Sequence, residues 1–289
     1  MTRDRVISSA IGVPLMGLLV YFGGLRSWAG GALLVAAVGA LAYLALNEFL
    51  SALKRKDYRA EKEVVVAATV FLVVAVWISE IQRATTDALV GVAIVAVAVA
   101  TLAVKALRSE PDDAVANVGA TLLAFVYVGC LFTYFLRLRL IDIPGDVGGV
   151  RVWSFLHECG ALLFVFVAAW MTDTGAWFFG RMLGRHRMAP AVSPKKTIEG
   201  ALAGVLTGTA FACLVAWWIH LPLVHGFILG VLLSVVGQVG DLSESLLKRD
   251  LGIKDAGDVI PGHGGVLDRF DSLLFAMPLA FYYLRLFVV

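Results

Sequence analysis

Hydrophobic and polar positions alternate along this chain on the scale of whole segments rather than single residues. Long apolar runs of Ala, Val, Leu and Gly are separated by short charged clusters. A helix needs roughly 20 mostly apolar residues to cross the hydrocarbon core of a bilayer. Nine runs meet this length, which predicts an all-α, polytopic bundle of transmembrane helices, over residues 6–25, 28–50, 64–82, 86–107, 115–140, 155–182, 197–219, 222–247 and 270–288.

The distribution of basic residues predicts the orientation of these helices. With the N-terminus in the cytoplasm, 18 of the 24 Lys and Arg residues fall on the cytoplasmic side and six on the far side. This bias follows the positive-inside rule and places the C-terminus outside. The run after Arg3 and Arg5 is as long as a full span, so we interpret it as the first helix and not as a signal peptide.

Composition agrees with a membrane protein and excludes other classes. The chain of 289 residues is 60% hydrophobic, with a mean hydropathy of +0.86, and only 16% of its residues are charged. A net charge of +2 is too small to indicate a nucleic-acid partner. Cys130, Cys159 and Cys213 lie in or beside apolar runs without metal-ligand spacing, so we interpret them as small buried hydrophobes.

The two halves of the chain differ in where their polar residues lie. Residues 1–140 hold five spans with almost no ionisable residues at depth, which is typical of a scaffold. Residues 141–289 hold four spans that carry polar residues within or at the ends of the apolar runs. Such residues are costly in a membrane and mark a functional region, here His157, Glu158, Asp173, Glu199, Asp241 and Glu244. The alternative for His157 and Glu158 is an interfacial pair on the far side of the membrane.

The strongest cluster runs from Ser245 to Asp271 and joins the last two predicted helices. A shared helical face near the end of the eighth span carries Asp241, Ser245 and Lys248. Pro261 and the glycines after it favour a tight non-helical loop. The two helix ends could therefore bring Asp241 and Asp268 together among several basic residues, which is typical of a metal–polyphosphate site. The alternative is a solvated charged loop that only supplies the positive-inside bias.

A second cluster begins at Asp173, which shares a helical face with Trp177, Gly180 and Arg181. Ser193-Pro194 is typical of a helix start, with Ser as the N-cap and Pro at the first position. Backbone N–H groups there, beside Lys195 and Lys196, would form an anion site. Structural alternatives are an Asp173–Arg181 pair and helix packing at Gly180 and Gly184.

These motifs resemble the phosphatidate cytidylyltransferase (CDP-diacylglycerol synthase) family. The likeness covers about residues 170–275 and includes Asp-Thr-Gly-Ala, Ser-Pro-Lys-Lys-Thr-x-Glu-Gly and Gly-Asp-Leu-x-Glu-Ser. The run from Ser245 to Asp271 matches throughout, with Lys-Arg, Lys-Asp and Pro-x-His-Gly-Gly-x-x-Asp-Arg-x-Asp in order. The resemblance implies that CTP and phosphatidic acid give CDP-diacylglycerol and pyrophosphate with Mg²⁺, in a homodimeric protein of the bacterial inner membrane.

The resemblance also implies roles for individual residues. Asp241 and Asp268 are the expected Mg²⁺ ligands, with Asp173 near the metal or nucleotide and a second cation as a further option. Basic residues are expected to hold phosphates or clamp the site, namely Lys195, Lys196, Lys248, Arg249 and Arg269. Other expected substrate contacts are Ser193, Thr197, Glu199, Ser245, His263, Gly264 and Gly265.

Elementary chemistry fits a site of this composition. A lipid phosphate monoester has a second pKa of about 6, so at neutral pH it can attack the α-phosphorus of CTP without a general base. The reaction then needs cations and alignment more than a catalytic His. Because CTP comes from water and the lipid head group lies at the membrane interface, we expect the site at the cytoplasmic surface. Two alternatives remain open: transfer to another lipid such as an ether lipid or polyprenol, and an ion-coupled transporter.

Overall fold

The computed structural model describes residues 28–82, 87–139, 141, 143, 160–257 and 264–289. Within these residues, eight helical segments are long and apolar enough to cross a membrane. The helices are α2 (Trp28–Lys54), α3 (Lys62–Gln82), α4 (Asp87–Leu107), α5 (Ala114–Ala124), the π-helix η1 (Phe125–Cys130), α6 (Leu131–Arg139), α8 (Gly160–Leu183), α9 (Ile198–Trp218), α10 (Leu223–Asp250) and α11 (Leu267–Phe287). One membrane segment is formed by α5, η1 and α6 in series.

These eight segments match the last eight predicted spans and confirm the all-α transmembrane class. The first predicted span, residues 6–25, lies outside the described residues. Side chains on α4 show the membrane character directly, because Val92, Val95 and Val99 are each about 60% exposed. So much exposed apolar surface is unfavourable in water, whereas the hydrocarbon core of a bilayer solvates it. The orientation of the helices across the membrane stays a prediction.

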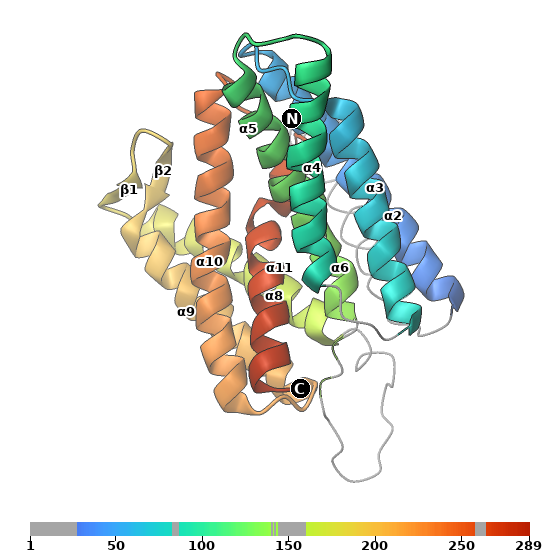
Figure 1. Ribbon diagram of the computed structural model, residues 1–289. Coiled ribbons are helices and arrows are strands. Elements are labelled where there is room, and N and C mark those ends of the chain that lie inside the picture. The colour runs from blue at the N-terminus through green and yellow to red at the C-terminus, as the bar shows by residue number, and fades with distance from the viewer. Residues whose placement is uncertain (1–27, 83–86, 140, 142, 144–159, 258–263) are drawn as a thin grey trace.

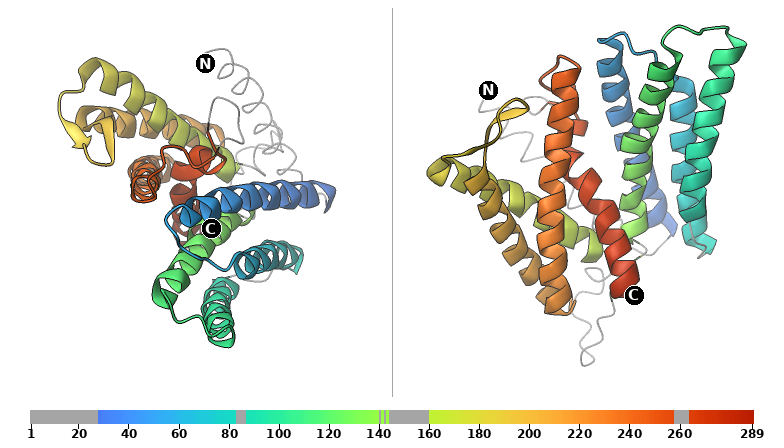
Figure 2. Two further views of the ribbon diagram at one scale, coloured as in Figure 1. Left: turned by 90° about the horizontal axis from the view of Figure 1, so that it is seen from above. Right: turned by 60° about the vertical axis from the view of Figure 1, so that its left-hand side comes forward.

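The helices form two groups around a central pair (Figure 1). α10 and α11 lie in the middle, α8 and α9 cover one side, and α2 to α5 lie on the other (Figure 2). The α2–α3 turn, the α4–α5 turn and the end of α10 meet at one end of the bundle (Figure 1). There an ion pair of 2.5 Å joins Lys56 Nζ to Asp250 Oδ1, and its hydrogen bond raises the pKa of Lys56.

Small residues allow α8, α9 and α10 to approach closely. Gly200, Gly204 and Gly208 recur at every fourth position of α9 and so form a strip on one face. A Cβ atom at Gly204 would lie 2.8 Å from the carbonyl oxygen of Thr172 on α8, and one at Gly200 would lie 2.8 Å from Gly180 Cα. Association through small residues is typical of membrane helices, where hydrophobicity does not drive helix contacts.

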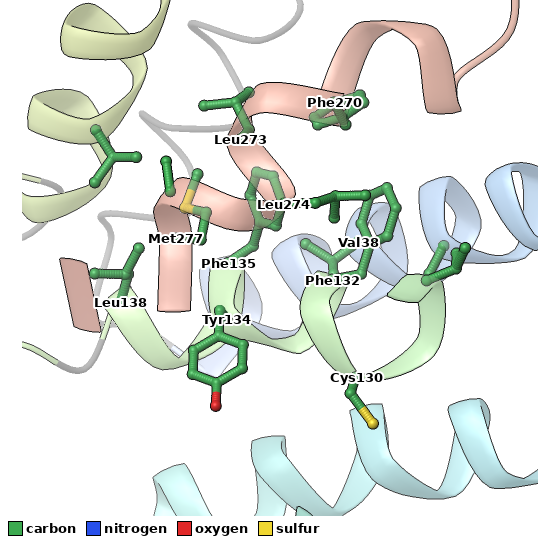
Figure 3. Close-up of a cluster of buried hydrophobic side chains, with 14 of the residues drawn as sticks. Val38, Cys130, Phe132, Tyr134, Phe135, Leu138, Phe270, Leu273, Leu274 and Met277 are labelled. Atoms are coloured by element: carbon green, nitrogen blue, oxygen red, sulfur yellow. The ribbon is translucent and has the colours of Figure 1, made fainter. Parts of the chain in front are cut away.

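Aromatic and aliphatic side chains join the two groups of helices. Phe270 on α11 lies with its ring centroid 5.5 Å from that of Phe132 and 5.6 Å from that of Phe135, both on α6 (Figure 3). Cys130 is buried beside this cluster, as predicted, whereas Cys213 is only partly buried and Cys159 lies outside the described residues. The core therefore fixes the start of α11 against the N-terminal half.

The predicted helix start at Ser193-Pro194 is wrong. Ser193–Thr197 forms strand β2, which pairs antiparallel with β1 (Arg187–Ala189) in a hairpin at the edge of the bundle (Figure 1). Helix α9 begins at Ile198, and Thr197 is its N-cap, accepting a hydrogen bond of 3.2 Å from Gly200 N. The Ser-Pro pair instead begins the strand that carries Lys195 and Lys196.

Candidate functional site

Polar side chains from α8, α10, α11 and β2 converge at the polar cluster that the sequence indicates. Lys196 Nζ on β2 lies 2.5 Å from Asp241 Oδ2 on α10, and both side chains are a little under one-third exposed. Asp173 on α8 and Asp271 on α11 are close enough for their charges to act on Asp241 and on each other. Four separate elements thus place three acids and a lysine within electrostatic range of one another.

Lys248 on α10 is the centre of a second group, which faces the start of α11. Its Nζ donates to Asp268 Oδ1 at 2.6 Å and lies 2.6 Å from Glu244 Oε2, the latter a charge contact without hydrogen-bond geometry. Asp268 Oδ2 accepts from the backbone N–H of Ala256 at 2.9 Å and of Gly265 at 2.8 Å. Both oxygens of Asp268 are therefore engaged, and this carboxylate organises the loop that precedes α11.

Gly264 belongs to the same loop and must be glycine for two reasons. Its φ of +82° lies in the left-handed region, which residues with a side chain rarely adopt. A Cβ atom there would also lie 2.7 Å from Asp268 Oδ2. The His-Gly-Gly part of the motif thus lets the backbone wrap closely around Asp268, although His263 itself lies outside the described residues.

Glu199 and Arg249 hold the hairpin in place. Glu199 Oε2 accepts from the backbone N–H of Arg185 at 3.0 Å, and Glu199 Oε1 lies 2.6 Å from Nδ1 of His186. Arg249 Nε donates to the carbonyl oxygen of Val192 at 3.3 Å, which ties the end of α10 to the hairpin. In this arrangement both residues position β2, and through it Lys196. Their predicted contacts with substrate stay predictions.

The remaining predicted residues within the described ranges lie on β2, α10 and α11, around this centre. Lys195 is exposed on β2, Ser245 is half-buried on α10, and Arg269 is exposed in the first turn of α11. Ser193 pairs with Ala189 in the hairpin. Asp241 and Asp268 lie on adjacent helices but contact different lysines, Lys196 and Lys248.

Sequence reasoning missed three residues at this site. The sequence places Asp271 on the same face as Asp268 at the start of the last helix, but no site role was predicted for it, although it lies within electrostatic range of Asp173 and Asp241. Glu48 is an acid within an apolar run, a signal that the scaffold interpretation of the first half overlooked. Tyr127 lies in η1, is 5% exposed, and its hydroxyl has no hydrogen-bond partner among the described residues.

The donor set suits a hard divalent cation in chemistry. The carboxylates of Asp173, Asp241 and Asp271 supply the oxygen atoms that Mg²⁺ prefers. As they stand, no three acidic, His or Cys side chains within the described ranges lie close enough to enclose an ion. Asp268 is the least available of these acids for coordinating a metal ion, because both of its carboxylate oxygens already accept hydrogen bonds. Metal binding by Asp173, Asp241 and Asp268 stays a prediction.

Fold and site together define a polytopic integral membrane protein that gathers acids and lysines in one polar cluster. A sequence profile described as the cytidylyltransferase family matches residues 3–287. A phosphatidate cytidylyltransferase of Synechocystis is 33% identical, over 99% of this chain and 97% of the relative. Those of Bacillus subtilis and Staphylococcus epidermidis are each 40% identical, over 59% and 55% of this chain and 60% and 55% of the relative. The chain belongs to the cytidylyltransferase family, which confirms the predicted resemblance.

Proposed function

We propose that this protein transfers the cytidylyl group of CTP to phosphatidic acid, giving CDP-diacylglycerol and pyrophosphate in phospholipid biosynthesis. The observation that carries the proposal is the match over 99% of the chain to a phosphatidate cytidylyltransferase. The site adds chemical support, because its lysines and acids converge from four elements that lie far apart in the sequence.

The reaction is a substitution at phosphorus. An oxygen of the lipid phosphate monoester forms a bond to the α-phosphorus of CTP, and the bond from that phosphorus to the β-phosphate oxygen breaks, releasing pyrophosphate. Because the monoester is largely a dianion at neutral pH, with a second pKa of about 6, no side chain has to remove a proton. The barrier comes from repulsion between anions, which positive groups and alignment lower.

The side chains divide this work. Lys195 and Lys196 on β2 and Lys248 on α10 would hold phosphate groups, while Arg269 would act as a clamp. Asp241 would bind Mg²⁺ with help from Asp173 and Asp271, with Asp268 and a second cation as further candidates. Bound Mg²⁺ would neutralise charge on the triphosphate and on the departing pyrophosphate. Lys196 now pairs with Asp241, so a substrate phosphate would compete for this lysine.

The placement of the enzyme follows from its substrates and charges. CTP arrives from water, and the lipid head group lies at the membrane interface, so the site would face the cytoplasm at the bacterial inner membrane. The excess of Lys and Arg on the predicted cytoplasmic side supports this orientation. We also propose that the enzyme is a homodimer, on the basis of its resemblance to the family.

The direct test uses detergent-purified protein with labelled CTP and phosphatidic acid, with and without Mg²⁺. Formation of labelled CDP-diacylglycerol only with Mg²⁺ is the expected result. Parallel reactions with an ether-linked phosphatidic acid and a polyprenyl phosphate separate the alternative acceptors. Turnover with one of these acceptors but not with phosphatidic acid would replace the proposed substrate, and no CDP-lipid from any acceptor would overturn the function.

A further inference from the structure

Glu48 is a buried acid on α2, in the half of the chain that the sequence presents as scaffold. Its side chain is 6% exposed. Glu48 Oε1 accepts from the backbone N–H of Val266 at 2.9 Å, and Glu48 Oε2 accepts from the backbone N–H of Leu267 at 3.0 Å. The two donors begin α11 and lie 218 and 219 residues away in the sequence. A residue of the first half therefore binds the turn that carries the catalytic motif.

The loop before α11 is built around this carboxylate. A Cβ atom at Gly265 would lie 2.5 Å from Glu48 Oε2, and one at Gly257 would lie 2.8 Å from Glu48 Oε1. Neither glycine has a positive φ, since among the described glycines only Gly252 and Gly264 do. The requirement for glycine at 257 and 265 thus comes from the space that Glu48 occupies.

The contact is physically favourable at a helix N-terminus. The first N–H groups of a helix have no partner within the helix, and the helix dipole favours negative charge beside them. A buried carboxylate without such donors would be costly. Successive N–H groups of one turn are shared between two acids: Gly265 donates to Asp268, whereas Val266 and Leu267 donate to Glu48.

We infer that Glu48 is a positioning residue for the reaction, because it fixes the turn from which Asp268 orients Lys248. The inference rests on the proposed function, in which Lys248 meets a substrate phosphate. A turn released from Glu48 would let Asp268 and Lys248 shift together. Displacement of a group by 1 Å can cost about 10²-fold in rate.

The first test replaces Glu48 by Gln, which keeps the shape, loses the charge and places an NH₂ group against a backbone N–H. We expect kcat/KM for CTP to fall at least about tenfold, approaching the cost of a small displacement. The matched control is Glu61→Gln, since Glu61 is an equally buried acid of the first half whose contacts are Lys105 and Arg108. The control should keep kcat/KM within about twofold while lowering the thermal midpoint.

A double-mutant cycle separates positioning from general damage. If Glu48 acts through Lys248, Glu48→Gln should add little to the loss caused by Lys248→Ala, whereas independent effects would multiply. Glu48→Gln with unchanged kcat/KM, or a Glu61→Gln loss of equal size, would overturn the inference. A double variant whose loss equals the product of the losses in Glu48→Gln and Lys248→Ala would also overturn it.

A readout without turnover keeps this inference distinct from the proposed function. Lys254 is exposed in the loop before α11, so trypsin cleavage after it reports the mobility of the loop. Cleavage should accelerate several-fold in Glu48→Gln and not in Glu61→Gln, even if the wild-type protein makes no CDP-lipid. If Glu48→Gln does not fold, the single variant Gly257→Ala provides the test. Its Cβ should displace Glu48 and make cleavage after Lys254 faster than in the wild-type protein, and equal cleavage rates would contradict the contact.

Discussion

At the scale of single residues, identical ion pairs can serve different ends. Asp241 and Asp250 lie on the same helix, and each contacts a lysine at 2.5 Å, Lys196 and Lys56 respectively. Asp241 also lies within electrostatic range of Asp173 on α8 and Asp271 on α11, whereas the Lys56–Asp250 pair is about half exposed. The surroundings, and not the pair itself, therefore distinguish the acid that we propose for metal binding from a surface contact.

This difference predicts the effects of two matched substitutions. Asp241→Asn should lower kcat on the order of 10²–10³-fold, the usual cost of removing one electrostatic contributor at an active site. Asp250→Asn should leave kcat within about twofold, since exposed pairs contribute little. Steady-state assays of both purified variants provide the measurement. Near-wild-type turnover by Asp241→Asn would remove the metal assignment.

Gly252 and Gly264, the two glycines with positive φ among the described residues, form a second matched pair. Gly264→Ala places a Cβ atom against Asp268, whereas the corresponding atom at Gly252 would meet nothing within 4 Å. Both substitutions should cost about 1–3 kcal/mol of stability through backbone strain. Only Gly264→Ala should also lower kcat/KM, because it displaces Asp268. Thermal midpoints and kcat/KM of both variants, measured side by side, test this difference. An equal loss of kcat/KM in both variants would contradict it.

At the scale of elements, helix lengths were predictable and helix contacts were not. Apolar runs such as 222–247 locate α10 well, because the bilayer fixes the minimum length of a span. The hairpin was missed, since Ser193-Pro194 is compatible with both a helix start and a strand. Pairing with Arg187–Ala189 decided for the strand, and such pairing is not a local property of the sequence.

Helix packing leads to a prediction on α9. Gly204→Leu should destabilise the protein by about 1–3 kcal/mol or more, because the side chain would collide with Thr172 and Ala176. The matched control is Gly91→Leu on α4, where a Cβ atom would meet nothing within 4 Å. Thermal unfolding of the detergent-solubilised variants, followed by size-exclusion chromatography, tests the difference. Equal midpoints would argue against close packing of α8 and α9.

At the scale of the whole molecule, the orientation in the membrane can be tested directly. In a background with Cys130, Cys159 and Cys213 replaced by Ala, single cysteines at Asp112 and Leu223 mark opposite ends of the bundle. A membrane-impermeant thiol reagent should label Leu223→Cys in intact cells and Asp112→Cys only after permeabilisation. The reverse pattern would place the site on the outer face, away from CTP.

The sequence by itself determined the membrane class, the eight helical spans that the structure describes, and the family. These depend on apolar length and on motif order, both of which are written in contiguous residues. Tertiary structure alone decided that Asp268 is enclosed by Lys248 and backbone N–H groups, that Asp271 lies within electrostatic range of Asp241, and that Glu48 binds the start of α11. The physical reason is that a buried carboxylate takes its partners from whichever donors the packed helices bring near, and those donors lie up to 219 residues away.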